Sequence, residues 1–113
     1  MDAGALDGFE AVARLAEVPP GQLLGVEMRD GERICLVNHD GVVCALADTC
    51  THQAFPISAG QLLPDGTVQC VWHGARFDRT TGAVLQGPAL DALERFEVMV
   101  DDDVVLVRRG RTS

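Results

Sequence analysis

Two short segments, Cys50-Thr51-His52 and Cys70-Val71-Trp72-His73-Gly74, each combine one cysteine with one histidine. Residues 53–69 separate the two pairs. The spacings within the pairs, i to i+2 and i to i+3, are short enough for one loop to present a thiolate and an imidazole to the same metal centre. Together the segments supply two thiolates and two imidazoles. We therefore expect two loops that clamp one metal centre from opposite sides.

This set of donors is compatible with two kinds of metal centre. Two thiolates on one iron and two imidazoles on the other iron hold a [2Fe–2S] cluster with mixed ligands. A zinc ion also takes two Cys and two His ligands, but classical zinc fingers keep the two cysteines together and the two histidines together, with longer spacers. Here the ligand types alternate and lie closer. The pattern favours the iron–sulfur cluster, with a zinc-stapled interaction module as the alternative.

Short apolar runs separated by turn signals predict an all-β fold. Asp30-Gly31, Asp40-Gly41, Asp65-Gly66 and Thr81-Gly82 each lie between apolar segments, as the turns of β-hairpins do. Strands this short and frequent indicate an antiparallel sandwich or barrel. The predicted strands are Phe9–Leu15, Leu23–Met28, Ile34–Val37, Val42–Ala47, Thr67–Cys70, Arg76–Phe77, Val84–Leu85, Phe96–Val100 and Val104–Arg108.

The length of 113 residues predicts one domain, residues 1–113. Residues 48–88 carry every ligand candidate and little periodicity, so we expect them to form a cluster-binding subdomain built of loops on a β-scaffold. Residues 1–8 are predicted to be a flexible leader and Gly110–Ser113 a frayed tail. A helical turn is predicted within Leu90–Arg95.

The net charge of −8 argues against nucleic acid as a partner, because its phosphates would be repelled. It suits association with a protein that has a basic patch, and equally an ordinary role in solubility. No run approaches the roughly 18 apolar residues of a membrane span. The sequence also lacks the pattern of a secretory signal. These features predict a cytoplasmic protein that binds neither nucleic acid nor membrane.

Several other residues have plain structural interpretations. Cys35 and Cys44 lie inside apolar runs and are expected to be small buried hydrophobes. His39, beside the Asp40-Gly41 turn, is predicted to be a surface turn residue. Asp101-Asp102-Asp103 is predicted to be the tip of the last hairpin, because a cation site needs more oxygen ligands at set spacings. We expect Arg108, Arg109 and Arg111 to form a solvated chain end. The alternative is that they dock a partner.

The segments CTHQAFPISAG (residues 50–60) and VQCVWHGARFDRTTGAVLQGPA (residues 68–89) resemble Rieske-type ferredoxins, the electron carriers of bacterial aromatic-ring-hydroxylating dioxygenase systems. The resemblance begins at about Phe9. It implies one Rieske [2Fe–2S] cluster, with Cys50 and Cys70 on the inner iron and His52 and His73 on the outer iron near the surface. It also implies antiparallel sheets with an inserted cluster-binding subdomain, and a proline loop at residues 87–89 over the third side of the cluster.

The chain departs from the cytochrome bc-type branch of Rieske proteins at four matching positions. Phe55 and Trp72 stand where that branch has the cysteines of a disulfide between the two loops. Ala75 and Phe77 stand where it has hydroxyl groups that bond to sulfur. Hydrogen bonds to sulfur raise the reduction potential. Their loss predicts a potential at the low end of the Rieske range, near about −150 mV, which suits electrons from a flavin reductase.

The implied function is that of a single-electron carrier without a catalytic site. It would take electrons from an NAD(P)H-dependent ferredoxin reductase and pass them to a terminal Rieske oxygenase. Two alternatives are the small subunit of an assimilatory nitrite reductase and the Rieske domain of an oxygenase catalytic subunit. The second is disfavoured, because only His39 remains to build a 2-His-1-carboxylate iron site. The expected docking patch comprises His52, Phe55, Pro56, Trp72, His73 and Pro88. The alternative for Phe55 and Trp72 is that they merely shield the cluster.

Overall fold

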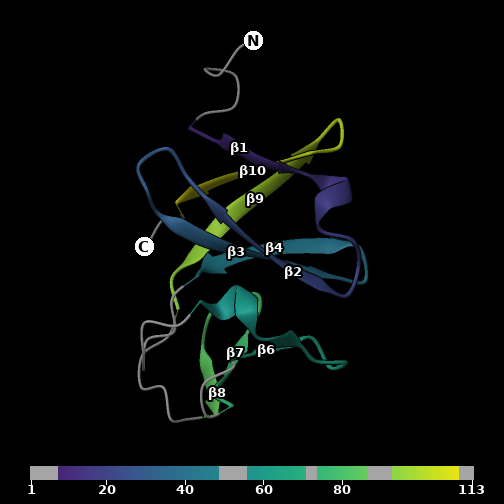
Figure 1. The fold of residues 1–113 in the computed structure, drawn as a ribbon, viewed down its shortest axis with the longest axis vertical. Coiled ribbons are helices and arrows are strands. Elements are labelled where there is room, and N and C mark those ends of the chain that lie inside the picture. Colours follow the sequence, from purple (N-terminus) through teal and green to yellow (C-terminus); the bar gives the residue numbers. More distant parts are fainter. Residues whose placement is uncertain (1–7, 49–55, 71–73, 87–92, 110–113) are drawn as a thin grey trace.

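The computed structural model describes residues 8–48, 56–70, 74–86 and 93–109. Their regular secondary structure consists of β-strands and two short 3-10 helices (Figure 1). None of their helices has the length and apolar character needed to cross a bilayer. In chain order the elements are β1 (Glu10–Arg14), η2 (Leu15–Glu17), β2 (Gln22–Glu27), β3 (Arg33–His39), β4 (Val42–Ala47), η3 (Ile57–Ala59), β5 (Gln61–Leu62), β6 (Thr67–Gln69), β7 (Arg76–Asp78), β8 (Val84–Gln86), β9 (Arg95–Asp101) and β10 (Val104–Arg109).

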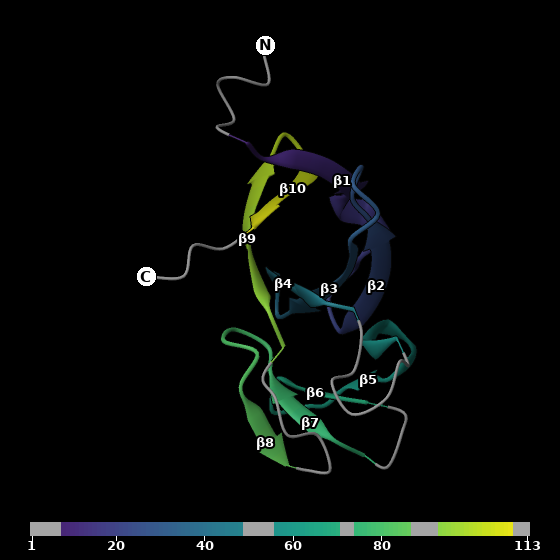
Figure 2. The same cartoon turned by 90° about the vertical axis from the view of Figure 1, so that its left-hand side faces the viewer.

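The strands form two antiparallel sheets. The larger sheet has the order β1-β10-β9-β4-β3-β2, and Figure 2 shows that it curls until β1 faces β2. The smaller sheet has the order β5-β6-β7-β8 and lies at one end of the larger sheet (Figure 1). The predicted all-β class is confirmed. All four strands of the smaller sheet fall inside residues 48–88, the range proposed as a cluster-binding subdomain.

Strand β3 is buried on both faces, which explains its unbroken apolar run. Side chains alternate between the two faces of a strand. Ile34 and Leu36 pack inside the curl of the larger sheet. Cys35 and Val37 pack in a second cluster that includes residues of the smaller sheet. The strand therefore joins the two apolar cores and supports the smaller sheet.

The predicted turns occur where the sequence placed them. Asp40 and Gly41 between β3 and β4 both have positive φ, 55° and 91°, as the central residues of a type I′ hairpin turn require. Of the predicted tip Asp101-Asp102-Asp103, Asp102 and Asp103 have φ values of 54° and 66° and form the tip of the β9–β10 hairpin, whereas Asp101 is the last residue of β9. Aspartate tolerates this left-handed region better than most residues.

Three details differ from the sequence-based expectations. The two-residue strand β5 was not predicted, because two residues are too few to show an alternating pattern. The expected helical turn is absent at Leu93 and Glu94, and β9 begins at the next residue; the rest of that prediction lies outside the described residues. His39 is the last residue of β3 and half-buried, with Nε2 3.4 Å from the carbonyl oxygen of Pro64. It therefore contacts the connection between β5 and β6, rather than being a surface turn residue as predicted.

The two described arginines of the C-terminal group are partnered. Arg108 lies 4.4 Å from the ring centroid of Phe9 and pairs with Glu97. Arg109 is half-exposed and pairs with Glu32 at 2.8 Å and Glu94 at 3.2 Å. Arg108 thus links β10 to β9, and Arg109 links β10 to the residues that directly precede β3 and β9. The leader predicted at residues 1–8, Gly8 excepted, and the predicted tail with Arg111 lie outside the described residues.

Candidate metal centre

Of the four predicted ligands, Cys70 is the one that the structure describes. Cys50, His52 and His73 lie outside the described residues, as do Phe55, Trp72 and Pro88 of the predicted docking patch. Pro56, the remaining member of that patch, is half-buried. The described residues show instead how the ends of three segments are held: residues 49–57 (the first ligand segment), residues 71–73 (the second ligand segment) and residues 87–92 (the proline segment).

The second ligand segment emerges from paired strands. Gln69 of β6 pairs with Arg76 of β7, and the Cys70 N–H donates to the carbonyl oxygen of Ala75 at 2.7 Å. Gly74, at the end of the segment, has a φ of 73°, a region that glycine adopts without steric cost. The β6–β7 hairpin therefore fixes the backbone on both sides of residues 71–73.

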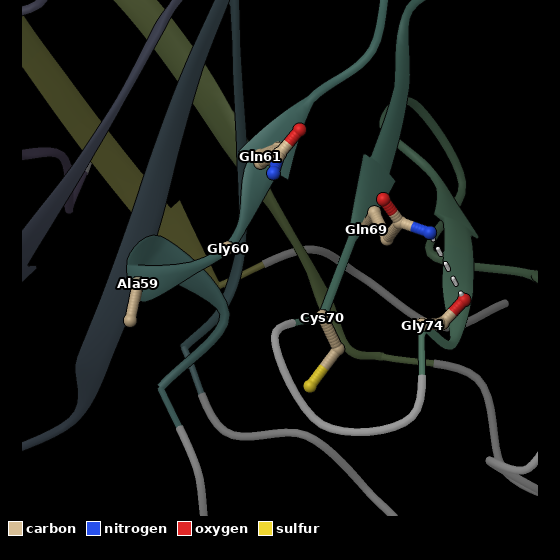
Figure 3. A pocket seen from close by; sticks show the side chains of 6 residues that line it. All are labelled: Ala59, Gly60, Gln61, Gln69, Cys70 and Gly74. Carbon is tan, nitrogen blue, oxygen red and sulfur yellow. Dashed lines mark hydrogen bonds between the residues drawn. The ribbon is translucent and has the colours of Figure 1, made fainter.

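The Cys70 side chain lies in the apolar core and at the wall of a cavity. It is 1% exposed and packs in the same cluster as Ala75 and Phe77. The cavity has a volume of about 250 Å³ (Figure 3). A buried sulfur beside such a space suits a soft metal centre that uses thiolate ligands. The residues that line the cavity are Ala59, Gly60, Gln61, Gln69, Cys70 and Gly74.

The first ligand segment is closed by a carboxylate at one end and a serine at the other. The Ser58 N–H donates to Oδ1 of Asp48 at 2.6 Å, and the Ser58 hydroxyl donates to Oδ2 at 2.7 Å. The Asp48 N–H donates to the carbonyl oxygen of Arg33 on β3 at 2.9 Å. The start and the end of this segment are thus held together against the larger sheet. Neither Asp48 nor Ser58 was among the predicted site residues.

The proline segment is anchored on both sides by the smaller sheet. Gln86, which precedes it, pairs with Arg76 of β7. Leu93, which follows it, is buried, and its N–H donates to the carbonyl oxygen of Gly82 at 2.8 Å. A Cβ at Gly82 would lie 2.0 Å from the Leu93 carbonyl oxygen, so this position requires glycine. All three segments therefore start and end in strands or hydrogen-bonded turns next to the smaller sheet.

The two hydroxyl positions of the cytochrome bc-type branch are apolar in the structure as well as in the sequence. Ala75 and Phe77 are both fully buried and pack in the cluster that contains Cys70. Neither side chain can donate a hydrogen bond. These two side chains therefore offer no hydrogen bond to the sulfur of Cys70.

Of the two remaining described cysteines, Cys35 is buried as predicted, whereas Cys44 is only half-buried. Cys35 is fully buried, and burial, followed by the nearby Asp48 charge, raises the pKa of its thiol far above the usual range. Cys44 is half-buried, and burial raises the pKa of its thiol too. The thiolate is the form that binds metal. Both residues therefore serve as apolar packing groups on the face of the larger sheet that meets the smaller one.

Comparison with known proteins gives a family for this fold and site. The family model described as Rieske [2Fe-2S] domain matches residues 8–97. Human "Apoptosis-inducing factor 3" is 36% identical over 103 residues, which are 91% of this chain but 17% of that relative. The "Biphenyl dioxygenase ferredoxin subunit" of Pseudomonas sp. (strain KKS102) is 31% identical over 105 residues, 93% of this chain and 95% of the relative.

A solved structure shows the same fold. It is the "Complex of reduced oxygenase and oxidized ferredoxin in carbazole 1,9a-dioxygenase", matched with a TM-score of 0.83 at 26% identity over 92% of this chain and 97% of the solved chain. The prediction of a Rieske-type β-fold is confirmed by this likeness, and that of one [2Fe–2S] cluster by the family match. With its two sheets, its buried Cys70 and a family match over residues 8–97, this chain belongs to the Rieske [2Fe-2S] domain family.

Proposed function

We propose that this protein is a Rieske ferredoxin of an aromatic-ring-hydroxylating oxygenase system. It would carry single electrons in the cytoplasm from an NAD(P)H-dependent reductase to a terminal oxygenase, with no catalytic site of its own. The observation that carries this proposal is the match with a dioxygenase ferredoxin subunit over 93% of this chain and 95% of that protein. The likeness to a ferredoxin solved in complex with an oxygenase adds support for the partner.

The proposed ligands are Cys50 and Cys70 for the inner iron and His52 and His73 for the outer iron. The cluster, when bound, supplies one-electron redox chemistry. This chain contributes the thiolate of Cys70 from a buried position next to Ala75 and Phe77. That apolar surrounding excludes water from the inner side of the site.

A low reduction potential is part of the proposal. Two neutral imidazoles in place of two thiolates raise the potential of a cluster above that of all-cysteine ferredoxins. Hydrogen bonds to sulfur would raise it further. Ala75 and Phe77 provide none, and both are fully buried in the core cluster that contains Cys70. A low potential suits a carrier that is reduced by a flavin reductase.

The proposed docking patch comprises His52, Phe55, Pro56, Trp72, His73 and Pro88, with the two histidines as the electron exit. Aromatic residues are favoured at the centres of protein interfaces. The net charge of −8 favours partners that present a basic surface around the contact, because complementary charges speed the encounter. We therefore expect both the reductase and the oxygenase reactions to slow as salt is added.

The test is an anaerobic redox titration of the purified protein, followed by mixing with an oxygenase. A reversible one-electron signal with the EPR signature of a histidine-ligated [2Fe–2S] cluster, at low potential, supports the carrier. Reoxidation of the reduced protein by an aromatic-ring-hydroxylating oxygenase supports the partner. A redox-silent protein that contains zinc would refute the electron carrier. Stable co-purification with a large sirohaem subunit would favour the nitrite reductase alternative.

A further inference from the structure

Asp48 and Ser58 are joined by two short hydrogen bonds across the first ligand segment. The distances are 2.6 Å from the Ser58 nitrogen to Oδ1 and 2.7 Å from the Ser58 hydroxyl to Oδ2. Asp48 follows β4 and Ser58 belongs to η3, so one carboxylate holds both ends of residues 49–57. We call this pair the Asp48–Ser58 clamp. The segment it closes carries two of the four proposed ligands.

The clamp contains a buried carboxyl group. Asp48 is 1% exposed, and it is the only buried carboxylate among the described residues. Burial of a carboxylate is costly even when hydrogen bonds compensate part of the loss of water. A neutral asparagine could also accept a hydrogen bond and close the segment. We therefore expect the Asp48 charge to have a role other than closing the first ligand segment.

Strand β2 leaves room for the clamp at one position. A Cβ on Gly25 would lie 2.6 Å from Oγ of Ser58 and 2.9 Å from Oδ2 of Asp48. Gly25 has no positive φ, so its backbone conformation does not explain the glycine. The space it leaves accommodates the clamp. Three elements, β2, the end of β4 and η3, thus meet at these two side chains.

The sequence places Asp48 two residues before a proposed ligand. Asp48 is two residues before Cys50, so their Cα atoms are at most about 7.6 Å apart. Reduction adds one negative charge to the cluster. A buried carboxylate near the cluster would oppose that added charge, because charges interact more strongly in the protein interior than in water.

We propose that the Asp48–Ser58 clamp positions the first ligand segment and that the Asp48 charge lowers the reduction potential of the cluster. This inference rests on the proposed ligand roles of Cys50 and His52. It predicts that loss of the charge and loss of the clamp have different effects. Asp48→Asn removes the charge but keeps an acceptor for Ser58. Ser58→Ala keeps the charge but removes one of the two hydrogen bonds.

Another aspartate offers a matched control. Asp65 accepts hydrogen bonds from the Thr67 N–H at 3.0 Å and the Thr67 hydroxyl at 2.7 Å, the same chemistry as in the clamp. It lies in the exposed turn between β5 and β6, away from the ends of the first ligand segment. Asp65→Asn and Thr67→Ala therefore make the same chemical changes as Asp48→Asn and Ser58→Ala, but leave the clamp unchanged.

The experiment compares the four variants and the wild type by redox titration and by the rate at which a chelator removes iron. For Asp48→Asn we expect at least a threefold higher ratio of reduced to oxidised protein at a fixed potential. This ratio corresponds to about 28 mV, from 59 mV per tenfold for one electron. For Ser58→Ala we expect at least threefold faster iron loss without a rise in potential. Both control variants should match the wild type.

Equal potentials in Asp48→Asn and Asp65→Asn, or equal iron loss in Ser58→Ala and Thr67→Ala, would overturn the inference. If Asp48→Asn is isolated without its cluster, the rate of iron loss from Gly25→Ala tests the clamp instead. This substitution crowds the clamp but keeps the Asp48 charge. It must then lose iron at least threefold faster than Gly41→Ala, where an added Cβ meets no atom within 4 Å. A wild type that lacks the EPR signature would instead refute the proposed ligand set.

Discussion

The backbone N–H of Cys70 donates to the carbonyl oxygen of Ala75 with 2.7 Å between nitrogen and oxygen. This bond continues the β6–β7 pairing to Cys70, the cysteine of the second Cys–His pair. The Cys70 side chain packs in the same core cluster as Ala75 and Phe77, which holds it in place. Because this sulfur is already fixed before the cluster binds, its side chain loses little conformational entropy on binding. The entropic cost of binding is therefore lower.

Cys70→Ser is expected to abolish the cluster, because the hydroxyl of serine is a hard and weakly acidic donor in place of a thiolate. Visible absorbance and iron content of the purified variant check this. Cys44→Ser is the control, since Cys44 is half-buried and packs against the same core cluster. That variant should keep a full complement of iron. Retention of the cluster in Cys70→Ser would contradict the assignment of this ligand.

Ala75→Ser is expected to raise the reduction potential. A serine hydroxyl at this fully buried position could donate to a sulfur atom of the site. One hydrogen bond has a net worth of about 0.5–1.5 kcal/mol, which for one electron is about 20–65 mV. Ala45→Ser is the matched control, because Ala45 is 2% exposed but packs in the other core cluster. Redox titrations that show equal potentials for the two variants would refute the explanation of the low potential.

Much of the fold follows from local patterns in the sequence. Asp40-Gly41 between two apolar runs predicts a type I′ turn, and both residues have positive φ in the structure. The run Val42–Ala47 predicts strand β4 with its exact ends. These features depend on neighbours along the chain, so the sequence displays them directly. The ligand roles of all four candidates stay predictions, and the structure describes the position of Cys70 alone among them.

The features that the sequence did not predict depend on contacts between distant residues. Asp48 and Ser58 are ten positions apart, and nothing in their spacing indicates that they bond. Their pairing arises when η3 packs on β2 beside Gly25. The role of His39 as a contact to Pro64 likewise arises from the packing of the smaller sheet against the end of β3. Such contacts become visible only when the two sheets are placed together.

Gly82→Ala is expected to destabilise the fold strongly. Gly82 has a φ of 79°, and an added Cβ would lie 2.0 Å from the carbonyl oxygen of Leu93. Left-handed strain of about 1–2 kcal/mol adds to an overpacking cost of about 1–3 kcal/mol. Gly41→Ala is the control, since its φ is 91° but an added Cβ meets nothing within 4 Å. Denaturant unfolding should show the larger loss for Gly82→Ala, and equal losses would contradict the close approach of Leu93.

Acid is expected to weaken the β7–β8 turn through Asp78. Hydrogen bonds from the Thr80 hydroxyl and N–H, at 2.5 and 2.7 Å, hold the pKa of Asp78 below its usual range. A carboxylate with a lowered folded-state pKa contributes stability that is fully present above the unfolded value of about 3.9 and is lost as the pH falls through the folded value. The free energy of unfolding should therefore fall below about pH 4 by less in Asp78→Asn than in the wild type.

The measurement for Asp78 is denaturant unfolding between pH 7 and pH 3 in both proteins. Asp102→Asn is the control, because Asp102 lies at the exposed tip of the β9–β10 hairpin. Its removal should leave the pH dependence close to that of the wild type. If Asp78→Asn instead follows the wild type through the whole range, the Thr80 hydrogen bonds do not stabilise the charged form. The turn that places Gly82 against Leu93 would then depend on backbone bonds alone, which the Gly82 N–H bond to the carbonyl oxygen of Asp78 at 2.8 Å already provides.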